Sequence, residues 1–101
     1  MPTSVTRLLP WTGADDRICL LITDGRGRGP VSRVADQVEA VQLGMGVELI
    51  GHAEDLLADP GTDAAQVRYV AVRLTEALRD AVRVAVSRGE RLRGTERPAP
   101  E

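Results

Sequence analysis

The chain has 101 residues, a single cysteine and a formal net charge of −2, and it contains neither Lys nor Phe. This length predicts one domain, the charge disfavours a general nucleic-acid binder, and one cysteine excludes a disulfide within the chain. No apolar run approaches the roughly 20 residues of a membrane span or follows the first residues as a signal peptide would. We therefore expect a cytoplasmic protein without membrane association.

The N-terminal region predicts a short β-hairpin. Residues 5–11 and 17–23 are rich in residues that favour strands, and a turn-forming sequence at 12–16 separates them. Because an isolated hairpin is only marginally stable in water, we expect it to pack on the rest of the protein. Trp11, beside the turn, is a candidate either for the core or for an interface.

A glycine- and arginine-rich loop follows the second strand. Its central residues are Gly25, Arg26, Gly27, Arg28 and Gly29. Pro30 then suits the first turn of a helix. Backbone amides and arginine side chains at such a position can bind phosphate, although the loop lacks the Lys and the Ser/Thr of a P-loop. The loop supports an alternative function, the binding of a small ligand or a nucleotide phosphate.

Apolar residues then recur at steps of three and four, which predicts a helix over residues 31–58. We expect its inner face to carry Val34, Val38, Val41, Met45, Leu49, His52 and Leu56. Gly44, Gly46 and Gly51 lie inside this helix, where each glycine costs about 1 kcal/mol relative to alanine. Two interpretations stay open, of which we favour the first: close packing of a second helix on Gly44 and Gly51, or a break at Gly44–Gly46.

A Pro-Gly turn ends this helix, and a second helix is predicted over residues 63–88. Thr62 or Asp63 can cap it, and Gln66 stands where a capping box places its partner. Its apolar residues are Val67, Val70, Leu74, Ala77, Leu78, Ala81, Val84 and Ala85. The sequence around residues 91–101 holds few apolar residues, and we expect a disordered tail there.

The two helices should form an antiparallel hairpin, because the connection between them is short. Six acidic residues and no basic one lie between Asp36 and Asp59, whereas seven Arg and three acidic residues lie between Ala64 and Arg93. These opposite charges favour the pairing, although each exposed pair contributes little. We therefore predict a mainly α protein, in which residues 1–90 form a single helical-hairpin domain with a short N-terminal β-hairpin.

Few residues could carry catalysis or bind a metal. His52 is the only histidine and Cys19 the only cysteine, so a nucleophile–histidine set has little support. Glu48, His52 and Asp55 share one side of the first helix, and two copies could hold a metal between them, but a partly buried His at an interface edge explains the pattern as well. We predict no catalytic, cofactor or metal site. Nucleic-acid binding is unfavoured, because stacking aromatics and a recognition-helix arrangement are missing.

Both helices carry more apolar surface than one contact between them can cover. The candidate interface residues are Trp11, Leu43, Val47, Ile50, His52, Leu57, Tyr69, Val72, Val82 and Val86. They can meet the β-hairpin, a second copy or another protein, and a homodimer and a hetero-complex bury the same faces. We predict a non-enzymatic protein–protein interaction module with a regulatory or scaffold role, which we expect to form a homodimer with a four-helix arrangement.

Three segments of the chain resemble small proteins of Streptomyces and related actinomycetes. They are RLLPWTG at residues 7–13, EAVQLGMG at 39–46 and RLTEAL at 73–78, and the resemblance covers about residues 5–92. The basic residues, all of them Arg, fit the codon usage of a GC-rich genome. No activity is assigned to that group, so the resemblance implies a lineage and a regulatory or accessory role, and it assigns no functional residue.

Overall fold

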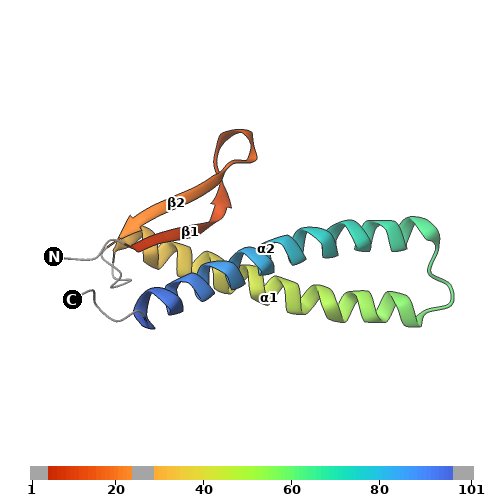
Figure 1. The fold of residues 1–101 in the computed structure, drawn as a ribbon. Helices are drawn as coiled ribbons and strands as arrows, with labels where there is room; N and C mark the ends of the chain where they lie inside the picture. Colours follow the sequence, from red (N-terminus) through yellow and green to blue (C-terminus); the bar gives the residue numbers. More distant parts are fainter. Residues whose placement is uncertain (1–4, 24–28, 97–101) are drawn as a thin grey trace.

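The computed structural model describes residues 5–23 and 29–96, which form a β-hairpin followed by two long helices (Figure 1). β1 (Val5–Thr12) and β2 (Ile18–Thr23) are joined by a short 3-10 turn, η1 (Ala14–Asp16), and α1 (Pro30–Ala58) and α2 (Ala64–Glu96) follow. The predicted helical hairpin with an N-terminal β-hairpin is thus confirmed. Within the described ranges, neither helix combines the length and the apolar character that a membrane crossing requires.

The turn between the helices is built from local caps. The hydroxyl of Thr62 donates a hydrogen bond of 2.6 Å to the carbonyl oxygen of Leu56, at the end of α1. The amide N–H of Gln66 donates to the Asp63 carboxylate at 2.8 Å, and the amide N–H of Asp63 donates to the Gln66 side chain at 2.9 Å. This reciprocal pair is the predicted capping box, which satisfies two amides that the helix itself leaves without partners.

Helix α2 is longer than the sequence suggests. It extends to Glu96 rather than to residue 88, so residues 91–96 belong to the helix and not to a disordered tail. Arg91 explains part of this extension, because its guanidinium donates to the Ser87 hydroxyl at 2.7 Å and lies 3.4 Å from the Glu39 carboxylate. Residues 97–101 of the expected tail lie outside the described residues.

The helices meet along a seam that repeats at steps of three and four. Its α1 residues are Ser32, Ala35, Glu39, Gln42, Gly46, Leu49, Ala53 and Leu56, and its α2 residues are Val70, Leu74, Ala77, Ala81, Val84, Ser87 and Arg91, all buried or half-buried. This seam differs from the expected inner face of α1, because Val34, Val41, Met45 and His52 are exposed. The small residues of the seam let the helices approach closely, so the more apolar neighbouring stripe remains outside.

The glycines of α1 do not break the helix, and Gly44 and Gly51 do not take part in the contact with α2. Helix α1 is continuous through Gly44 and Gly46. A Cβ atom added at Gly44, Gly46 or Gly51 would meet no heavy atom within 4 Å beyond the helix's own backbone. The predicted close packing on Gly44 and Gly51 is therefore wrong within the chain, because the seam passes beside these two residues.

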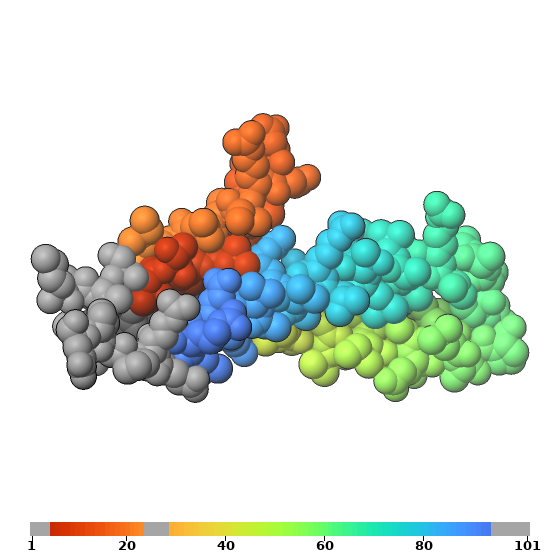
Figure 2. Space-filling model, in the orientation of Figure 1, coloured from red at the N-terminus to blue at the C-terminus, as the bar shows by residue number. Residues whose placement is uncertain are grey.

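The β-hairpin lies on one side of the helix pair, over the end where α1 begins and α2 ends (Figure 1). Leu8 pairs with Leu20, and Thr12 pairs with Ile18. Between these two pairs β1 has three residues and β2 has only Cys19, so β1 contains a bulge. A bulge bends the strand that carries it, and Figure 2 shows the tip of the hairpin projecting away from the helices. Asp15 and Asp16, at the tip, adopt left-handed backbone conformations with φ of 60° and 56°, which Asp tolerates better than most residues.

Candidate interaction surfaces

A groove lies between the two helices, and one of its lining residues, Gln42, also donates a hydrogen bond to the Pro10 carbonyl oxygen of β1. Its volume is about 360 Å³, and it is lined by Gln42, Met45, Glu48, Leu49, His52, Arg73, Glu76, Ala77 and Asp80. Met45, Glu48 and His52 each precede a seam residue of α1 by one position, and Arg73, Glu76 and Asp80 do the same in α2. Residues one position before the seam therefore share one side of the hairpin, which we call the groove face.

The groove face is rich in ionisable groups that are partly paired with one another. Arg73 contacts the Glu76 carboxylate at 3.0 Å and lies over the ring of Tyr69, 5.7 Å from its centre. Asp80 lies 3.8 Å from Arg83. Both ion pairs connect residues three positions apart on exposed or half-exposed surface, where such pairs contribute only a few tenths of a kcal/mol.

The groove brings the predicted pair Glu48 and His52 opposite Glu76 and Asp80 of α2, but it does not include Asp55. In the part of the chain that the structure describes, no group of three or more His, Cys, Asp or Glu side chains is placed to hold a metal ion. Sequence reasoning missed the α2 residues of the groove. Which α2 residues lie opposite Glu48 and His52 depends on the register between the two helices, and that register is set by the packing of the seam.

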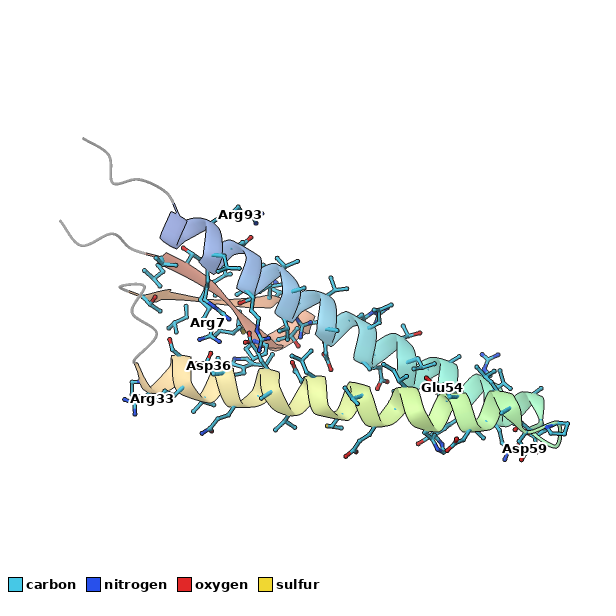
Figure 3. The ribbon with its side chains drawn as sticks, turned by 90° about the horizontal axis from the view of Figure 1, so that it is seen from below. Arg7, Arg33, Asp36, Glu54, Asp59 and Arg93 are labelled. Atoms are coloured by element: carbon cyan, nitrogen blue, oxygen red, sulfur yellow. The ribbon has the colours of Figure 1, made fainter. Side chains whose placement is uncertain are left out.

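The opposite side of the hairpin carries residues one position after the seam, and we call it the open face. We limit the name to residues 40–57 of α1 and 71–85 of α2, because the same pattern continues beyond them with Arg33, Asp36, Arg88 and Leu92. Within these limits the residues are Ala40, Leu43, Val47, Ile50, Glu54 and Leu57 of α1 and Ala71, Thr75, Leu78, Val82 and Ala85 of α2. Among these eleven residues Glu54 alone is charged. In Figure 3, which is seen from below, the β-hairpin lies behind the two helices. All but Leu43 are exposed, so the described structure leaves a mainly apolar surface with one charged residue without cover.

Five of the ten predicted interface residues lie on the open face: Leu43, Val47, Ile50, Leu57 and Val82. His52 lines the groove, and Tyr69 lies beside Arg73. Trp11 is half-buried in β1. Val72 and Val86 are exposed but do not belong to the open face. The structure places Leu78 on the open face, although the spacing of apolar residues in α2 predicted it on the side that packs against α1.

A buried polar cluster fastens β1 to both helices beneath the β-hairpin. Arg7 donates hydrogen bonds to the Ser32 carbonyl oxygen at 3.0 Å and to the Asp36 carboxylate at 2.6 Å, and Figure 3 shows Arg7 and Asp36 facing each other. Glu39 lies 3.4 Å from Arg7 and from Arg91 and is only 1% exposed. Sequence reasoning missed this cluster, whose one signal is a charged residue inside a predicted strand.

The predicted anion-binding loop falls mainly outside the described residues, which exclude positions 24–28. Gly29, which follows it, caps α1 without a side-chain hydrogen bond. Binding of a small ligand or nucleotide phosphate by this loop stays a prediction.

Comparison with known proteins returned no matching family model, no matching curated protein and no matching solved structure.

Proposed function

We propose that this chain is a non-enzymatic protein–protein interaction module that forms a homodimer by pairing two open faces into a four-helix arrangement. The observation that carries the proposal is the open face itself, an exposed surface of two adjacent helices with one charged residue among eleven. Mainly apolar surfaces of this extent on a small protein typically mark interaction sites.

The distribution of burial supports the same conclusion. Among the described residues, the buried hydrophobic core consists of Leu9, Ala35, Ala53, Val70 and Val84. Seventeen large hydrophobic residues are exposed, and Arg7, Ser32, Glu39 and Ser87 are buried. A chain of this size buries only a small hydrophobic core. Burial of its exposed aliphatic side chains by a partner would therefore add substantially to its hydrophobic stabilisation.

The open face has about the size that a specific dimer needs. It runs over about 18 residues of α1, a length of roughly 27 Å, and two packed helices are about 20 Å wide. Pairing two such faces buries about 1,000 Å² in total, near the lower limit of specific protein interfaces.

Charge selects between the two ways in which twofold-related hairpins can stack. Helix α1 carries five acidic residues and one Arg, a net charge of −4, and α2 carries seven Arg and four acidic residues, a net charge of +3. Stacking α1 on the partner's α1 would oppose like charges. A twofold axis along the hairpin places each α1 over the partner's α2 instead, which opposite charges favour.

The dimer leaves both β-hairpins on its outer sides, because they lie opposite the open faces. Two identical outward surfaces allow one dimer to engage two partner molecules, or one symmetric partner, and this arrangement suits a regulatory or scaffold role.

The test compares one substitution on the two faces of the same helix. Val47, on the open face, and Val41, on the groove side, are 69% and 60% exposed. Val47→Glu should weaken dimerisation about 100-fold or more, because it buries an unpaired charge, whereas Val41→Glu should leave it nearly unchanged. Sedimentation equilibrium between about 1 and 100 μM, which suits dissociation constants in the micromolar range, measures both. A monomeric wild-type chain, or equal loss in both variants, would refute the proposal.

The stacking of unlike helices has its own test. Val47 and Leu78 both lie near the middle of the open face. In a Cys19→Ser background, an equimolar mixture of Val47→Cys and Leu78→Cys chains should form disulfide-linked heterodimers under oxidation, as α1 over the partner's α2 requires. Predominant cross-linking of Val47→Cys to itself would show that like helices stack and that charge does not decide the arrangement.

A further inference from the structure

The two edges of the β-sheet differ in how the rest of the chain covers them. On β1, the Ser87 hydroxyl donates to the Leu8 carbonyl oxygen at 3.0 Å, and the Gln42 side chain donates to the Pro10 carbonyl oxygen at 2.8 Å. Helix side chains thus occupy the carbonyl groups that β1 presents away from β2. In the described sheet β2 pairs only with β1, so its own outer edge has no neighbouring strand.

β2 also lacks the features that usually prevent a strand edge from pairing. Its sequence from Ile18 to Thr23 contains no charged residue and no proline, and the bulge of the sheet lies on β1. Ile18, Leu20 and Ile22 point away from the helices and are 65%, 55% and 73% exposed. A regular aliphatic edge strand without protection is prone to pair with another strand.

The outward residues of β2 are self-complementary. They read Ile-Leu-Ile in either direction, with Leu20 at the centre. In an antiparallel pair of two β2 strands centred on Leu20, each Ile18 faces the partner's Ile22 and Leu20 faces its own copy. On the other side of the sheet, Cys19 faces the partner's Leu21. Every cross-strand pair is apolar, and such pairs are the units that stabilise a sheet.

We infer that β2 is a second self-association site, at which two copies pair antiparallel around Leu20 to form the four-stranded sheet β1-β2-β2-β1. A register shift must be two residues or a multiple of two to keep Ile18, Leu20 and Ile22 on the same face. Any such shift places at least one of the two Ile residues opposite a residue outside β2, so the register centred on Leu20 buries the most aliphatic surface. The site lies on the side of the helix pair that carries the β-hairpin. It is therefore separate from the open face, and it links homodimers into larger assemblies.

Disulfide trapping tests the strand pairing and its register, in a Cys19→Ser background. Leu20→Cys should form a disulfide-linked dimer under mild oxidation, because the two residues 20 face each other across the strands. Ile22→Cys alone should not, since the two residues 22 are separated by four residues along the strands, about 13 Å. A mixture of Ile18→Cys and Ile22→Cys chains should cross-link. Equal cross-linking of Leu20→Cys and Ile22→Cys would overturn the inference.

The mass of the assembly tests the pairing without cross-linking and separates it from the open-face dimer. Light scattering at increasing concentration should show wild-type assemblies that grow beyond a dimer. Leu20→Lys should stop this growth at the dimer, because it places two like charges opposite each other, whereas Thr6→Lys, on the same face but in β1, should not. In the Val47→Glu background, Leu20→Lys should convert the remaining dimer into a monomer. If Leu20→Lys changes no mass in either background, β2 does not pair with a second copy.

Discussion

The two faces of the helical hairpin are made from the same two helices, yet they differ in the charge that they carry. The groove face carries Glu48, His52, Arg73, Glu76 and Asp80, beside the exposed Val34, Val41 and Met45 of the same side. The open face carries one charged residue among eleven and has no cover in the described structure. The difference in charge separates a surface that water solvates well from one that a single chain leaves exposed without charges, and the proposed dimer depends on the second.

The covered base of the molecule relies on directional contacts instead of apolar volume. Arg7 reaches from β1 to Ser32, Asp36 and Glu39 of α1, while Arg91 of α2 approaches the same Glu39. Such a cluster requires correct placement of every member, because a buried charge that loses its partner is strongly destabilising. It therefore sets where the β-hairpin sits, whereas the open face leaves the choice of a partner to surface complementarity.

Neutralising Glu39 should give the largest effect, and it tests whether the covered face depends on charge. Glu39→Gln removes the only acidic partner that Arg7 and Arg91 share in the buried cluster, and we expect a loss of about 3–5 kcal/mol in the free energy of unfolding. Urea unfolding followed by circular dichroism measures it. Asp36→Asn is the matched control, since the Asp36 side chain is 57% exposed, and its loss should stay near 1 kcal/mol. Equal losses would remove the distinction between the two carboxylates.

Replacing one valine of the seam and one valine of the open face by alanine distinguishes the contribution of the core to stability from that of the proposed interface. Val84 is 2% exposed, so Val84→Ala should lower the stability by about 2 kcal/mol at every protein concentration. Val47→Ala should change it by less than about 0.5 kcal/mol in dilute solution, and by more where the dimer is populated. Thermal unfolding at two concentrations measures both. A Val47→Ala effect independent of concentration would contradict the assignment of the open face.

Filling a glycine of α1 should be stabilising in the single chain. Gly51 is exposed and has open space around its missing Cβ, so Gly51→Ala should raise the free energy of unfolding by about 1 kcal/mol in dilute solution through helix propensity alone. Gly61→Ala is a contrasting control, because its Cβ would lie 3.2 Å from the Asp59 carboxylate. Chemical unfolding of both variants would show whether the gain is specific to the helix. A loss at Gly51 in dilute solution would mean that something in the chain packs against it.

The smallest effect should come from the exposed charges of the groove face. Arg73→Gln removes the pair with Glu76 and should cost less than about 0.5 kcal/mol. It should also leave the dimerisation constant unchanged, because Arg73 lies on the side away from the open face. Sedimentation equilibrium together with urea unfolding checks both expectations, and a large change in dimerisation would place the interface on the groove face.

Much of the fold was predictable from local sequence. The strand–turn–strand pattern, the Pro-Gly turn and the Asp63–Gln66 capping box indicate the correct elements in the correct order. These features act over a few residues, so their physical cause is present in the sequence itself. The end of α2 was missed because Arg91 is held by Glu39, a residue far away in the chain.

The candidate surfaces were only partly predictable. Apolar periodicity correctly shows that α1 has more than one apolar stripe, and it places Val47, Ile50 and Leu57 away from the contact with α2. It cannot show which stripe the neighbouring helix selects, since adjacent stripes of α1 have the same period. The partners of His52 in the groove depend on that selection as well.

The sequence by itself determined two amphipathic helices of opposite charge, the hairpin between them and a surplus of aliphatic residues. Only the tertiary structure decided that small and polar residues form the seam, that Arg7 and Glu39 are buried beneath β1, and that many aliphatic residues of both helices and of β2 stay exposed. The physical reason is the range of the interactions. Caps and periodicity act within a few residues, whereas the seam and its register depend on side chains of two helices and a strand that meet only after folding.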